Sequence, residues 1–408
     1  MIWWHPFAEF LFWTCALLVV YSYAIYPVLV SLLAFCFGRT AQPQSPADAD
    51  LPSLALLIAA HNEESEIAAR IENALTMNYP REKLEILIAS DGSTDATAEI
   101  VRGYAAQGVR LLDYRVNRGK ATTLNSAMEE VRSDVVILSD ANTHMDPESA
   151  RHLVRWFDDP AVGAVCGRLS LHERDGSRNA DSLYWKYETF MKKCESRLGA
   201  LLGANGANYA IRRELFVPIP PDTIIDDFVI PLQARLRTGC AILFDHQSVA
   251  REETPENLGA EFRRRARIGA GGYQSICLLW PLLHPRHGWI AFTFLSHKIL
   301  RWFCPFFLLG MLGSSIALGD QPLYRWALLA QSLSYCTAAF AHFVPGRWTL
   351  LKPLRLPSMF ALMNLALLVG FFRWLRGSQK GTWQRTARVG ESTSAVEERC
   401  AGVTVPSR

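Results

Sequence analysis

The hydrophobic positions of this chain fall into three zones. From about Phe7 to Phe37 nearly every residue is apolar, with Glu9 as the only charged side chain. A helix of that length spans a bilayer core of about 30 Å with some tilt. A cleaved signal peptide would begin with basic residues and have a shorter apolar core, and residues 1–6 contain neither Lys nor Arg. We therefore expect an uncleaved transmembrane anchor at residues 1–39, followed by a polar, proline-containing linker at 40–50.

Residues 51–256 have the mixed pattern of a globular domain. Apolar runs alternate with stretches of helical spacing such as Glu64–Met77 and Asp95–Ala106. The predicted strands are Leu54–Ala60, Leu84–Ser90, Val109–Tyr114, Val135–Asp140, Val162–Leu171 and Ala241–Asp245. Strands that alternate with helices predict an α/β fold, with a mostly parallel, Rossmann-like sheet covered by helices on both faces. Ligands of such sheets bind beyond the carboxyl ends of the strands.

The third zone is apolar again and is rich in basic residues at its borders. Residues 257–300 begin with the arginine-rich stretch Glu261–Gly272, which is typical of amphipathic helices at a membrane interface. Transmembrane segments are expected within 301–376, at about Trp302–Leu318, Leu323–Val344 and Leu356–Leu375. The tail at 377–408 is polar and partly disordered by composition. Trp383, in this tail, is typical of an interface anchor.

Two orientations of the tail remain open. Three full C-terminal spans would leave the tail on the opposite side from the globular domain, whereas a re-entrant segment near Met359–Phe372 would return it. Arg39, directly after the first apolar run, places the globular domain in the cytoplasm by the positive-inside rule. We therefore expect an integral membrane protein, in a bacterial inner membrane, with a cytoplasmic domain.

Composition narrows the class of protein. Half of the residues are hydrophobic and only 20% are charged, which is apolar for a soluble enzyme. The net charge of +3 is too small to indicate a nucleic-acid partner. The nine cysteines form no Cys-x-x-Cys pair and no zinc-like spacing with histidine, so neither disulfides nor a cysteine-bound metal are expected.

Acidic residues close two of the predicted strands. Asp91 and Asp140 end their strands, and Asn142 follows two residues later. Mg²⁺ takes oxygen ligands and commonly uses one or two protein carboxylates together with substrate phosphates. Asp140 and Asn142 therefore fit a metal–diphosphate site. As alternatives, Asp140 caps a helix starting near Pro147, or Asn142 makes an Asx-turn.

The residues after Asp91 have a structural interpretation of their own. The sequence Asp91–Asp95 is typical of a turn leading into a helix, with Ser93 or Thr94 as its N-cap. That interpretation explains Gly92 and Ser93, but it does not explain an aspartate at the end of an apolar strand.

Two further motifs carry charged side chains at predicted loops. Lys120, with the helix that follows it, fits phosphate binding, or else it is a solvated loop lysine. Asp226 and Asp227 lie among apolar residues, which suits a general base whose pKa is raised by burial. The alternative is a pair of charges at a helix N-terminus.

The small-residue sequence Gly203–Asn208 could pass close to a sugar, or it is only a turn and a cap. Arg264 and Arg267 are three residues apart and share a helix face. They fit a clamp for a diphosphate, although contacts with lipid headgroups are the commoner role of such arginines.

The order of these motifs resembles that of family 2 glycosyltransferases, in the membrane-embedded branch that includes chitin, hyaluronan and poly-N-acetylglucosamine synthases. The resemblance covers about Leu51 to Arg388. The matching motifs are Ala60–Glu64, Ser90–Asp95, Asn117–Lys120, Ser139–Asn142, Gly203–Gly206, Ile225–Asp227 and Arg264–Arg267, with Phe294–Lys298 and Lys380–Thr386 further along.

The resemblance implies a glycosyltransferase A-type fold and a role for each motif. His61, Glu63 and Asp91 would bind the donor nucleotide, with Lys120 nearby. Asp140 and Asn142 would hold Mg²⁺ or Mn²⁺. Asp227, beside Asp226, would deprotonate the acceptor hydroxyl, and Asn205 and Gly206 would contact the acceptor. Arg264 and Arg267 would close over the diphosphate.

Two departures from the family pattern qualify these implications. The metal motif ends in Asn142 where the family has Asp, so metal binding would rest mainly on Asp140. Ile268 stands where processive synthases carry Trp, which puts processivity in doubt and makes single addition at least as compatible with the sequence.

The expected function is that of an inverting, metal-dependent glycosyltransferase of polysaccharide or glycolipid biosynthesis. It would move a sugar, a hexose or N-acetylhexosamine, from a nucleotide-sugar donor to a glycan or lipid-linked acceptor, with membrane lipid as its surroundings. UDP is the expected nucleotide by family habit. The alternative is a membrane protein that binds nucleotide-sugars or transports glycans without chemistry. A nucleotidyltransferase would need a glycine-rich loop where His61–Glu64 stands.

Overall fold

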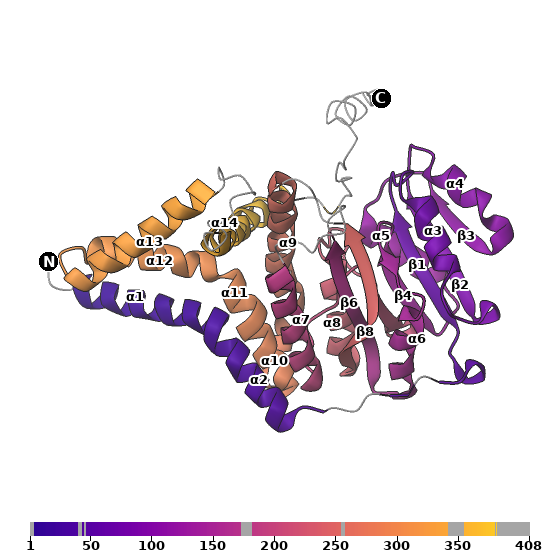
Figure 1. Ribbon diagram of the computed structural model, residues 1–408, viewed down its shortest axis with the longest axis horizontal. Coiled ribbons are helices and arrows are strands. Elements are labelled where there is room, and N and C mark those ends of the chain that lie inside the picture. Colours follow the sequence, from indigo (N-terminus) through magenta and orange to yellow (C-terminus); the bar gives the residue numbers. More distant parts are fainter. Residues whose placement is uncertain are drawn as a thin grey trace.

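The computed structural model describes residues 4–39, 43–44, 46–172, 182–253, 258–341, 355–379 and 381. A twisted sheet with its covering helices forms one part of the molecule, and helices from both ends of the chain extend away from it (Figure 1). The predicted motif at Lys380–Thr386 lies outside the described residues except for Gly381, and Trp383 lies outside them.

Eight strands form one sheet in the order β3-β2-β1-β4-β7-β6-β8-β5. The strands are β1 (Leu54–Ala60), β2 (Leu84–Asp91), β3 (Val109–Tyr114), β4 (Val135–Asp140), β5 (His144–Met145), β6 (Val162–His172), β7 (Tyr209–Arg212) and β8 (Ala241–Glu253). All six predicted strands are present. Strands β1 to β4 pair in parallel, and so do β6 and β8. The short β7 is antiparallel to both β4 and β6, and β5 is antiparallel to β8, so the sheet is mixed.

Helices cover both faces of the sheet, because its central strands are apolar on both sides; every residue of β1 is buried. One face packs against α3 (Ile67–Leu75), α4 (Thr97–Gly103) and α6 (Ser149–Val154). The other packs against α5 (Lys120–Glu130), α7 (Ser182–Arg197) and α8 (Asp226–Thr238). Short helical turns complete the domain at Asp48–Asp50, Arg81–Lys83, Ala105–Gln107, Arg155–Asp158 and Arg213–Leu215.

The chain begins with a long bent helix made of α1 (Trp4–Val20), the π-helical turn η1 (Tyr21–Ile25) and α2 (Tyr26–Phe37). A π-turn followed by Pro27 is a common cause of such a bend. Buried residues of α2, namely Tyr26, Val30 and Ala34, belong to the same apolar cluster as the inner residues of β1 and β2. The first helix is therefore part of the core on one face of the sheet.

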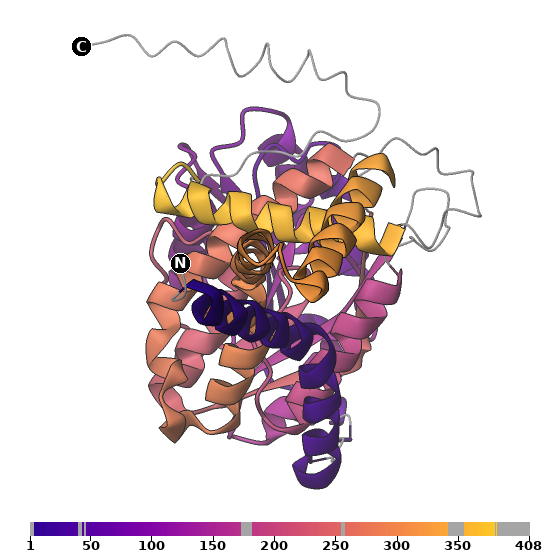
Figure 2. The same cartoon turned by 90° about the vertical axis from the view of Figure 1, so that its left-hand side faces the viewer.

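Helices also follow the sheet domain. They are α9 (Leu258–Leu279), α10 (Trp289–Thr293), η9 (Phe294–Ile299), α11 (Leu300–Trp302), α12 (Cys304–Ala317), α13 (Pro322–Ala341) and α14 (Arg355–Leu375), with short turns at Trp280–Leu283 and Pro285–His287. Helix α1 packs along α12, and α14 packs on α9 and α13. Figure 2 shows these helices from both ends of the chain side by side.

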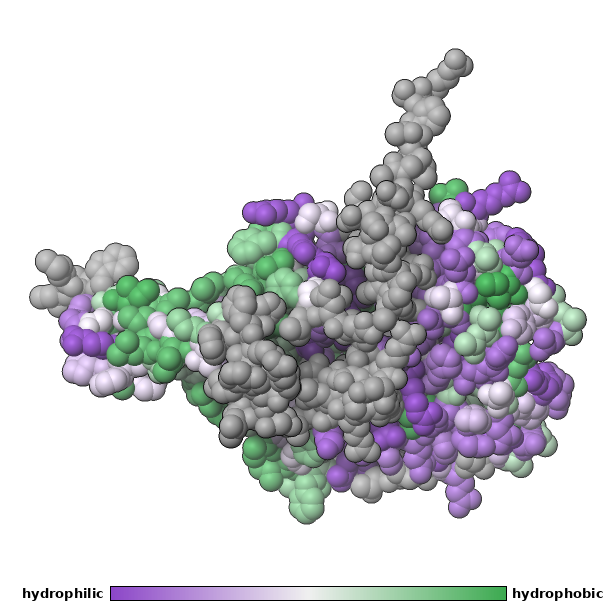
Figure 3. Space-filling model, turned by 45° about the horizontal axis from the view of Figure 1, so that its top comes forward, coloured by the Kyte–Doolittle hydropathy of each residue, from purple (hydrophilic) through white to green (hydrophobic). Residues whose placement is uncertain are grey.

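By length and composition, two of the described helices are apolar enough to cross a membrane, His5–Phe37 and Pro357–Leu375. A bent pair, Trp289–Trp302 with Cys304–Ala317, makes a third if it is counted as one broken span. The segment predicted at Trp302–Leu318 is thus a candidate span only together with the helix before it, because α12 by itself has only 14 residues. Helix α13 is not among these candidates, so a span at Leu323–Val344 remains a prediction. Hydrophobic surface gathers on the end helices, whereas the sheet domain is mostly hydrophilic (Figure 3).

Candidate active site

The predicted site residues from β1, β2 and β4 lie at one edge of the sheet, because these parallel strands share a direction and their carboxyl ends meet there. The loop after β1 contains Asn62, the only non-glycine residue of the described chain with a positive φ, at 55°. Asn62 Oδ1 accepts a hydrogen bond of 2.8 Å from the backbone N–H of Thr94, and its own N–H donates to Ser93 Oγ. The backbone N–H of Glu63 donates to Thr97 Oγ1 at 2.8 Å. The loops after β1 and β2 are therefore held together by side chains.

The turn after β2 is capped differently from the sequence prediction. Asp95 Oδ1, rather than Ser93 or Thr94, accepts from the backbone N–H of Thr97 at the start of α4. Asp95 also accepts from the N–H of Glu64 at 3.2 Å. The cap is therefore shared between the helix and the loop after β1. Ser93 and Thr94 bind Asn62 instead.

Asp91 is completely buried and arranges the loop in front of α5. Its two carboxylate oxygens accept hydrogen bonds from the backbone N–H groups of Arg118 (2.9 Å) and Gly119 (2.8 Å). Gly92 allows this approach, since a Cβ there would lie 2.4 Å from the backbone nitrogen of Asn117. His61 joins the same group: its Nδ1 lies 2.7 Å from Asp91 O and its Nε2 lies 3.0 Å from Asn117 Nδ2. The predicted donor-binding residues His61 and Asp91 are thus brought together.

Lys120 is the first residue of α5 and points into the site rather than into solvent. Its Nζ lies 2.7 Å from Asp140 Oδ1 and 3.3 Å from Asp226 Oδ2. Burial alone would lower the pKa of Lys120, but the carboxylates of Asp140 and Asp226 outweigh it and hold that pKa well above its usual value. Asp140 therefore pairs with Lys120, and α6 begins only at Ser149, so Asp140 is not a helix cap.

Asp226 and Asp227 begin α8, so the helix N-terminus and the acidic site coincide. Asp227 Oδ2 accepts a hydrogen bond of 2.9 Å from the backbone N–H of Gly206, and its carbonyl accepts from Ala204. Burial, together with the neighbouring charge of Asp226, raises the pKa of Asp227 to about 6. A carboxyl group with such a pKa is suited to accept a proton near neutral pH.

The loop from Gly203 to Asn208 passes directly over these carboxylates. A Cβ at Gly206 would lie 3.1 Å from Asp140 Oδ2, so a larger residue would crowd that oxygen. The side chain of Asn205 is held by its neighbours, donating to Gly167 O at 2.8 Å and accepting from Lys192 Nζ at 2.7 Å. Lys192, on α7, was not identified from the sequence because it belongs to none of the motifs.

Glu252, near the end of β8, is a second site residue that the sequence did not reveal. It accepts a hydrogen bond of 2.7 Å from Thr143 Oγ1, on the turn that follows Asp140. Burial and the nearby charge of Asp140 raise the pKa of Glu252 to about 7. The sequence Arg251–Glu253 looks like a surface charge run. The pairing of β8 with β6 and β5 brings Glu252 to the site.

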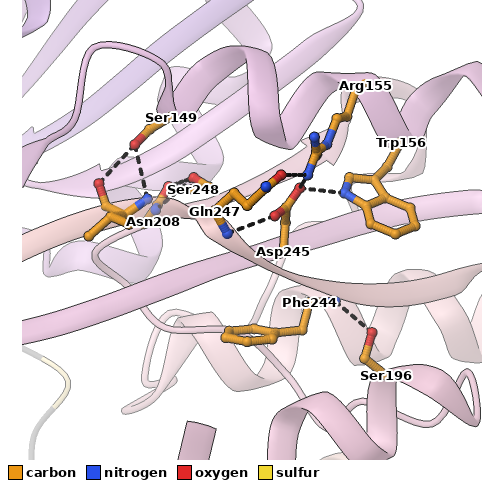
Figure 4. Close-up of polar contacts among 10 residues, drawn as sticks. Ser149, Arg155, Trp156, Ser196, Asn208, Phe244, Asp245, Gln247 and Ser248 are labelled. Carbon is orange, nitrogen blue, oxygen red and sulfur yellow. Dashed lines mark hydrogen bonds and ion pairs between the residues drawn. The ribbon is translucent and has the colours of Figure 1, made fainter. Parts of the chain in front are cut away.

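An irregularity in β8 sets the position of Glu252. Gly167 of β6 pairs with Asp245, but the next residue, Arg168, pairs with Val249, so residues 246–248 bulge out of the ladder. Buried side chains hold this bulge on both sides (Figure 4). Asp245 accepts from Arg155 Nη2 at 2.6 Å and from Trp156 Nε1 at 2.7 Å, and Asn208 Nδ2 donates to Ser248 Oγ at 3.0 Å. The register of the last five residues of β8 follows from this cluster.

The residues present fit a divalent cation whose other ligands come from substrate. Within the described chain no three His, Cys, Asp or Glu side chains gather closely enough to hold a metal by themselves. The carboxylates of the site nevertheless outnumber its lysine, and this surplus adds to burial, the larger cause, in raising the pKa of Asp227 and of Glu252. Asp140 offers a carboxylate, and half-buried Asn142 an amide oxygen, in the same turn. Positive charge brought by an ion would be stabilised here.

The arginines of α9 approach from the other side of the site. Arg267 Nη1 lies 3.4 Å from the carbonyl oxygen of Ile224, two residues before Asp226. Arg264 is paired with Glu261 at 2.9 Å and lies within electrostatic range of Glu252. Both arginines thus lie close to residues of the site, Arg267 to Ile224 and Arg264 to Glu252.

Comparison with known proteins agrees with this architecture. Residues 55–217 match the model of a protein family described as glycosyl transferase family 2. The chain is 28% identical over 274 residues to poly-beta-1,6-N-acetyl-D-glucosamine synthase of Staphylococcus aureus (strain COL), covering 61% of this chain and 64% of that protein. The corresponding synthase of Staphylococcus epidermidis is 25% identical over 244 residues, covering 56% and 57%. The chain therefore spans less than two thirds of the length of these relatives.

Among solved structures, a mannosyltransferase from Pyrobaculum calidifontis, determined with GDP-Man and Mn²⁺, has a TM-score of 0.66 at 23% sequence identity. The match covers 90% of this chain and 99% of that one. It confirms the predicted glycosyltransferase A-type fold. The staphylococcal synthases belong by name to the branch that the order of motifs predicted.

Proposed function

We propose that this chain, whose residues 55–217 match the model of glycosyl transferase family 2, is an inverting glycosyltransferase that acts at a membrane. It moves a hexose or N-acetylhexosamine from a nucleotide-sugar, a UDP-sugar, to a glycan or lipid-linked acceptor. The observation that carries the proposal is the arrangement of Asp227: its half-buried carboxyl group has a raised pKa and lies against Gly206, beside the Lys120–Asp140 pair.

The loops after β1 and β2 would receive the nucleotide. His61 and the Asn117–Gly119 loop, which Asp91 holds through two backbone N–H groups, form the wall of this part of the site. The diphosphate would lie toward Lys120 and the N-terminus of α5, where backbone N–H groups and a lysine favour anions. Lys120 would then exchange part of its contact with Asp140 for a phosphate oxygen.

Asp227 would act as the general base. The acceptor hydroxyl loses its proton to Asp227 while its oxygen forms a bond to the anomeric carbon. The bond from that carbon to the nucleoside diphosphate breaks on the opposite face, which inverts the configuration. Arg264 and Arg267 would add positive charge beside the departing diphosphate. Gly206, which no larger residue could replace without crowding Asp140, would leave room for the sugar.

A divalent cation, Mg²⁺ or Mn²⁺, would be held by Asp140 and Asn142 and would supply charge neutralisation for the leaving diphosphate. The surplus of carboxylates at this edge of the sheet supports such a cation. Because Asn142 is a neutral ligand, we expect Asp140 to account for most of the protein's share in metal affinity.

The alternative function is binding or transport of a nucleotide-sugar or glycan without chemistry. A protein that only binds its ligand has no need of a carboxyl group with a raised pKa, so this alternative leaves the raised pKa of Asp227 unexplained. The glycosyltransferase and the binding protein differ in the effect that we expect from the substitution Asp227→Asn.

The decisive experiment is turnover of a panel of UDP-sugars by the detergent-purified chain, with Mg²⁺ or Mn²⁺, beside the variant Asp227→Asn. The proposal expects one donor to be consumed in a metal-dependent way. It also expects a loss of turnover of about 10²–10⁴-fold in the variant with nearly unchanged donor binding. Donor binding without turnover, in the presence of a membrane lipid extract as acceptor source, would instead identify a binding protein.

A further inference from the structure

The loop that leads into the proposed base lies on one face of α9. This loop, residues Asp222–Ile225, ends where α8 begins at Asp226. Arg267, Gly271 and Gln274 stand at positions i, i+4 and i+7 of α9 and therefore share the face that meets the loop. Helices α8 and α9 also pack on each other.

Gln274 uses both polar atoms of its amide group to hold the loop. Its Oε1 accepts from the backbone N–H of Ile224 at 3.0 Å. Its Nε2 donates to the carbonyl oxygen of Asp222 at 2.9 Å and to Asp222 Oδ2 at 3.2 Å. The amide group can point only one way, because Ile224 offers a donor and Asp222 offers acceptors. One side chain of α9 thus binds two backbone groups of the loop.

Two further contacts on the same face bring the loop close to the helix. A Cβ at Gly271 would lie 2.9 Å from Ile225 Cγ2, so a larger residue there would push the loop away. Arg267 Nη1 lies 3.4 Å from the carbonyl oxygen of Ile224. The loop therefore rests on the turns of α9 that carry Arg267 and Gln274.

Helix α9 is in turn supported by α14, which contains the candidate membrane span Pro357–Leu375. A Cβ at Gly370 would lie 2.6 Å from the carbonyl oxygen of Ala266 and 2.7 Å from the backbone nitrogen of Ala270, so the two helices touch at the turn that contains Arg267. Figure 1 shows α9 between α14 and the sheet domain. Gln274 thus ties the loop to a helix that is fixed by packing on another side.

The proposed base is also held by a second loop. The backbone N–H of Gly206 donates to Asp227 Oδ2 at 2.9 Å, and the N–H of Ala204 donates to the carbonyl oxygen of Asp227 at 2.9 Å. These two bonds fix Asp227 relative to the loop that passes over the carboxylates. The contact through Gln274 fixes it relative to the arginines of α9.

We infer that Gln274 is a positioning residue of the proposed glycosyl transfer, which holds the loop Asp222–Ile225 on α9 and so sets the place of the Asp227 carboxylate relative to Arg267. The inference rests on the proposed function, in which Asp227 takes the acceptor proton and Arg267 lies beside the departing diphosphate. These groups act on opposite faces of the anomeric carbon, so in-line displacement depends on their separation. Gln274 acts through the loop and takes no part in bond making.

The test compares kcat for sugar transfer with UDP affinity in the detergent-purified full chain. Gln274→Met keeps the length of the side chain and loses its hydrogen bonds. We expect its kcat to fall about tenfold, because a small displacement of the base slows transfer, while the donor KM and the calorimetric Kd of UDP stay within about twofold. Asp222→Ala, at the surface, removes one of the three bonds and should lower kcat about twofold.

The matched control is Ser275→Ala, one residue along α9. Ser275 Oγ donates to the carbonyl oxygen of Gly271 within its own helix, so its loss should change neither kcat nor UDP affinity. Hydrogen exchange of residues 222–229, followed by mass spectrometry, reports on the loop without any turnover. Exchange should be faster in Gln274→Met than in the unsubstituted chain and unchanged in Ser275→Ala.

An unchanged kcat in Gln274→Met would overturn the inference. A parallel loss of kcat and UDP affinity would overturn it too, because the whole site would then be disturbed. An unsubstituted chain that turns over no donor refutes the proposed function instead. In that case the exchange measurement still decides whether Gln274 holds the loop, since equal exchange in the chain and the variant shows that it does not.

Discussion

The two halves of the sheet build their parts of the site in different ways. In the half formed by β1, β2 and β4, each functional side chain lies at the end of a strand or directly after it, as Asp91 does at the end of β2, where its carboxylate accepts from the backbone N–H groups of Arg118 and Gly119. In the half formed by β6, β7 and β8, the positions depend on contacts between residues far apart in sequence, such as Thr143 with Glu252. The first half is determined locally and the second by packing, so substitutions should affect them differently.

The largest effect is expected from breaking the buried cluster at the bulge of β8. Asp245→Ala removes the carboxylate that Arg155 and Trp156 share and leaves the charge of Arg155 without its ion-pair partner, and removing one partner of a buried ion pair costs about 3–5 kcal/mol. Chemical denaturation measures this loss in the free energy of unfolding. Asp113→Ala, which breaks the exposed pair with Arg102, is the matched control and should cost less than about 1 kcal/mol. Equal losses in both variants would show that the bulge is not held by this cluster.

A smaller and more local effect is expected in the other half. Asp91→Asn removes the carboxylate charge that accepts from the backbone N–H groups of Arg118 and Gly119. The loop before α5 should therefore lose its conformation, while the sheet keeps its structure. We expect UDP affinity to fall about 10- to 100-fold, measured by calorimetry, with a change in stability below that of Asp245→Ala. If UDP affinity is unchanged, the loop does not contribute to nucleotide binding.

The pH dependence of turnover should follow the ionisation of Asp227. The pKa of Asp227 is raised to about 6, and a base must be deprotonated to act, so kcat/KM should fall about tenfold per pH unit below pH 6 and level off above it. The measurement is a pH–rate profile with donor at low concentration. A break near pH 4 instead would indicate a carboxyl group in an ordinary environment.

The smallest effect is a gain in stability from the substitution that abolishes activity. A carboxyl group whose pKa is raised in the folded state, from 3.8 to about 6, lowers stability at pH values above its unfolded pKa. Asp227→Asn should therefore stabilise the protein by about 1–2 kcal/mol at pH 7, with the difference disappearing near pH 4. Thermal unfolding of the protein and the variant at the two pH values tests this. A variant less stable than the protein at pH 7 would contradict the inference that the folded state disfavours the charged form of Asp227.

The same contrast explains how much the sequence could predict. Strands β1, β3 and β4 were predicted to the residue, because buried parallel strands are continuous apolar runs between polar turns. Strand β7, of four residues, and β5, of two, have no such run and exist only through their antiparallel partners. β8 was predicted to end at Asp245, because the polar bulge that follows looks like a loop; the buried cluster carries the strand on to Glu253.

The candidate site shows the same division. His61, Asp91, Lys120, Asp140, Asp226, Asp227 and Gly206 were all named from the motif order, and the structure brings them to one edge of the sheet. The roles assigned to them remain predictions, as do those of Glu63, Asn142, Asn205, Arg264 and Arg267. Lys192 and Glu252 could not be found from the sequence, because a lone lysine on a helix and a glutamate in a charge run have no distinguishing pattern.

The apolar cluster shared by α2 and the sheet has a practical consequence for handling this protein. Tyr26, Val30 and Ala34 of the first helix are as deeply buried as the strands that they help to cover. Helix α2 packs on α7, so cutting the chain at the linker would uncover apolar residues beside α7 instead of releasing a soluble enzyme. A chain starting at Leu51 should aggregate when expressed without detergent, whereas one that retains α1 and α2 should purify as a dispersed particle, a difference that size-exclusion chromatography resolves.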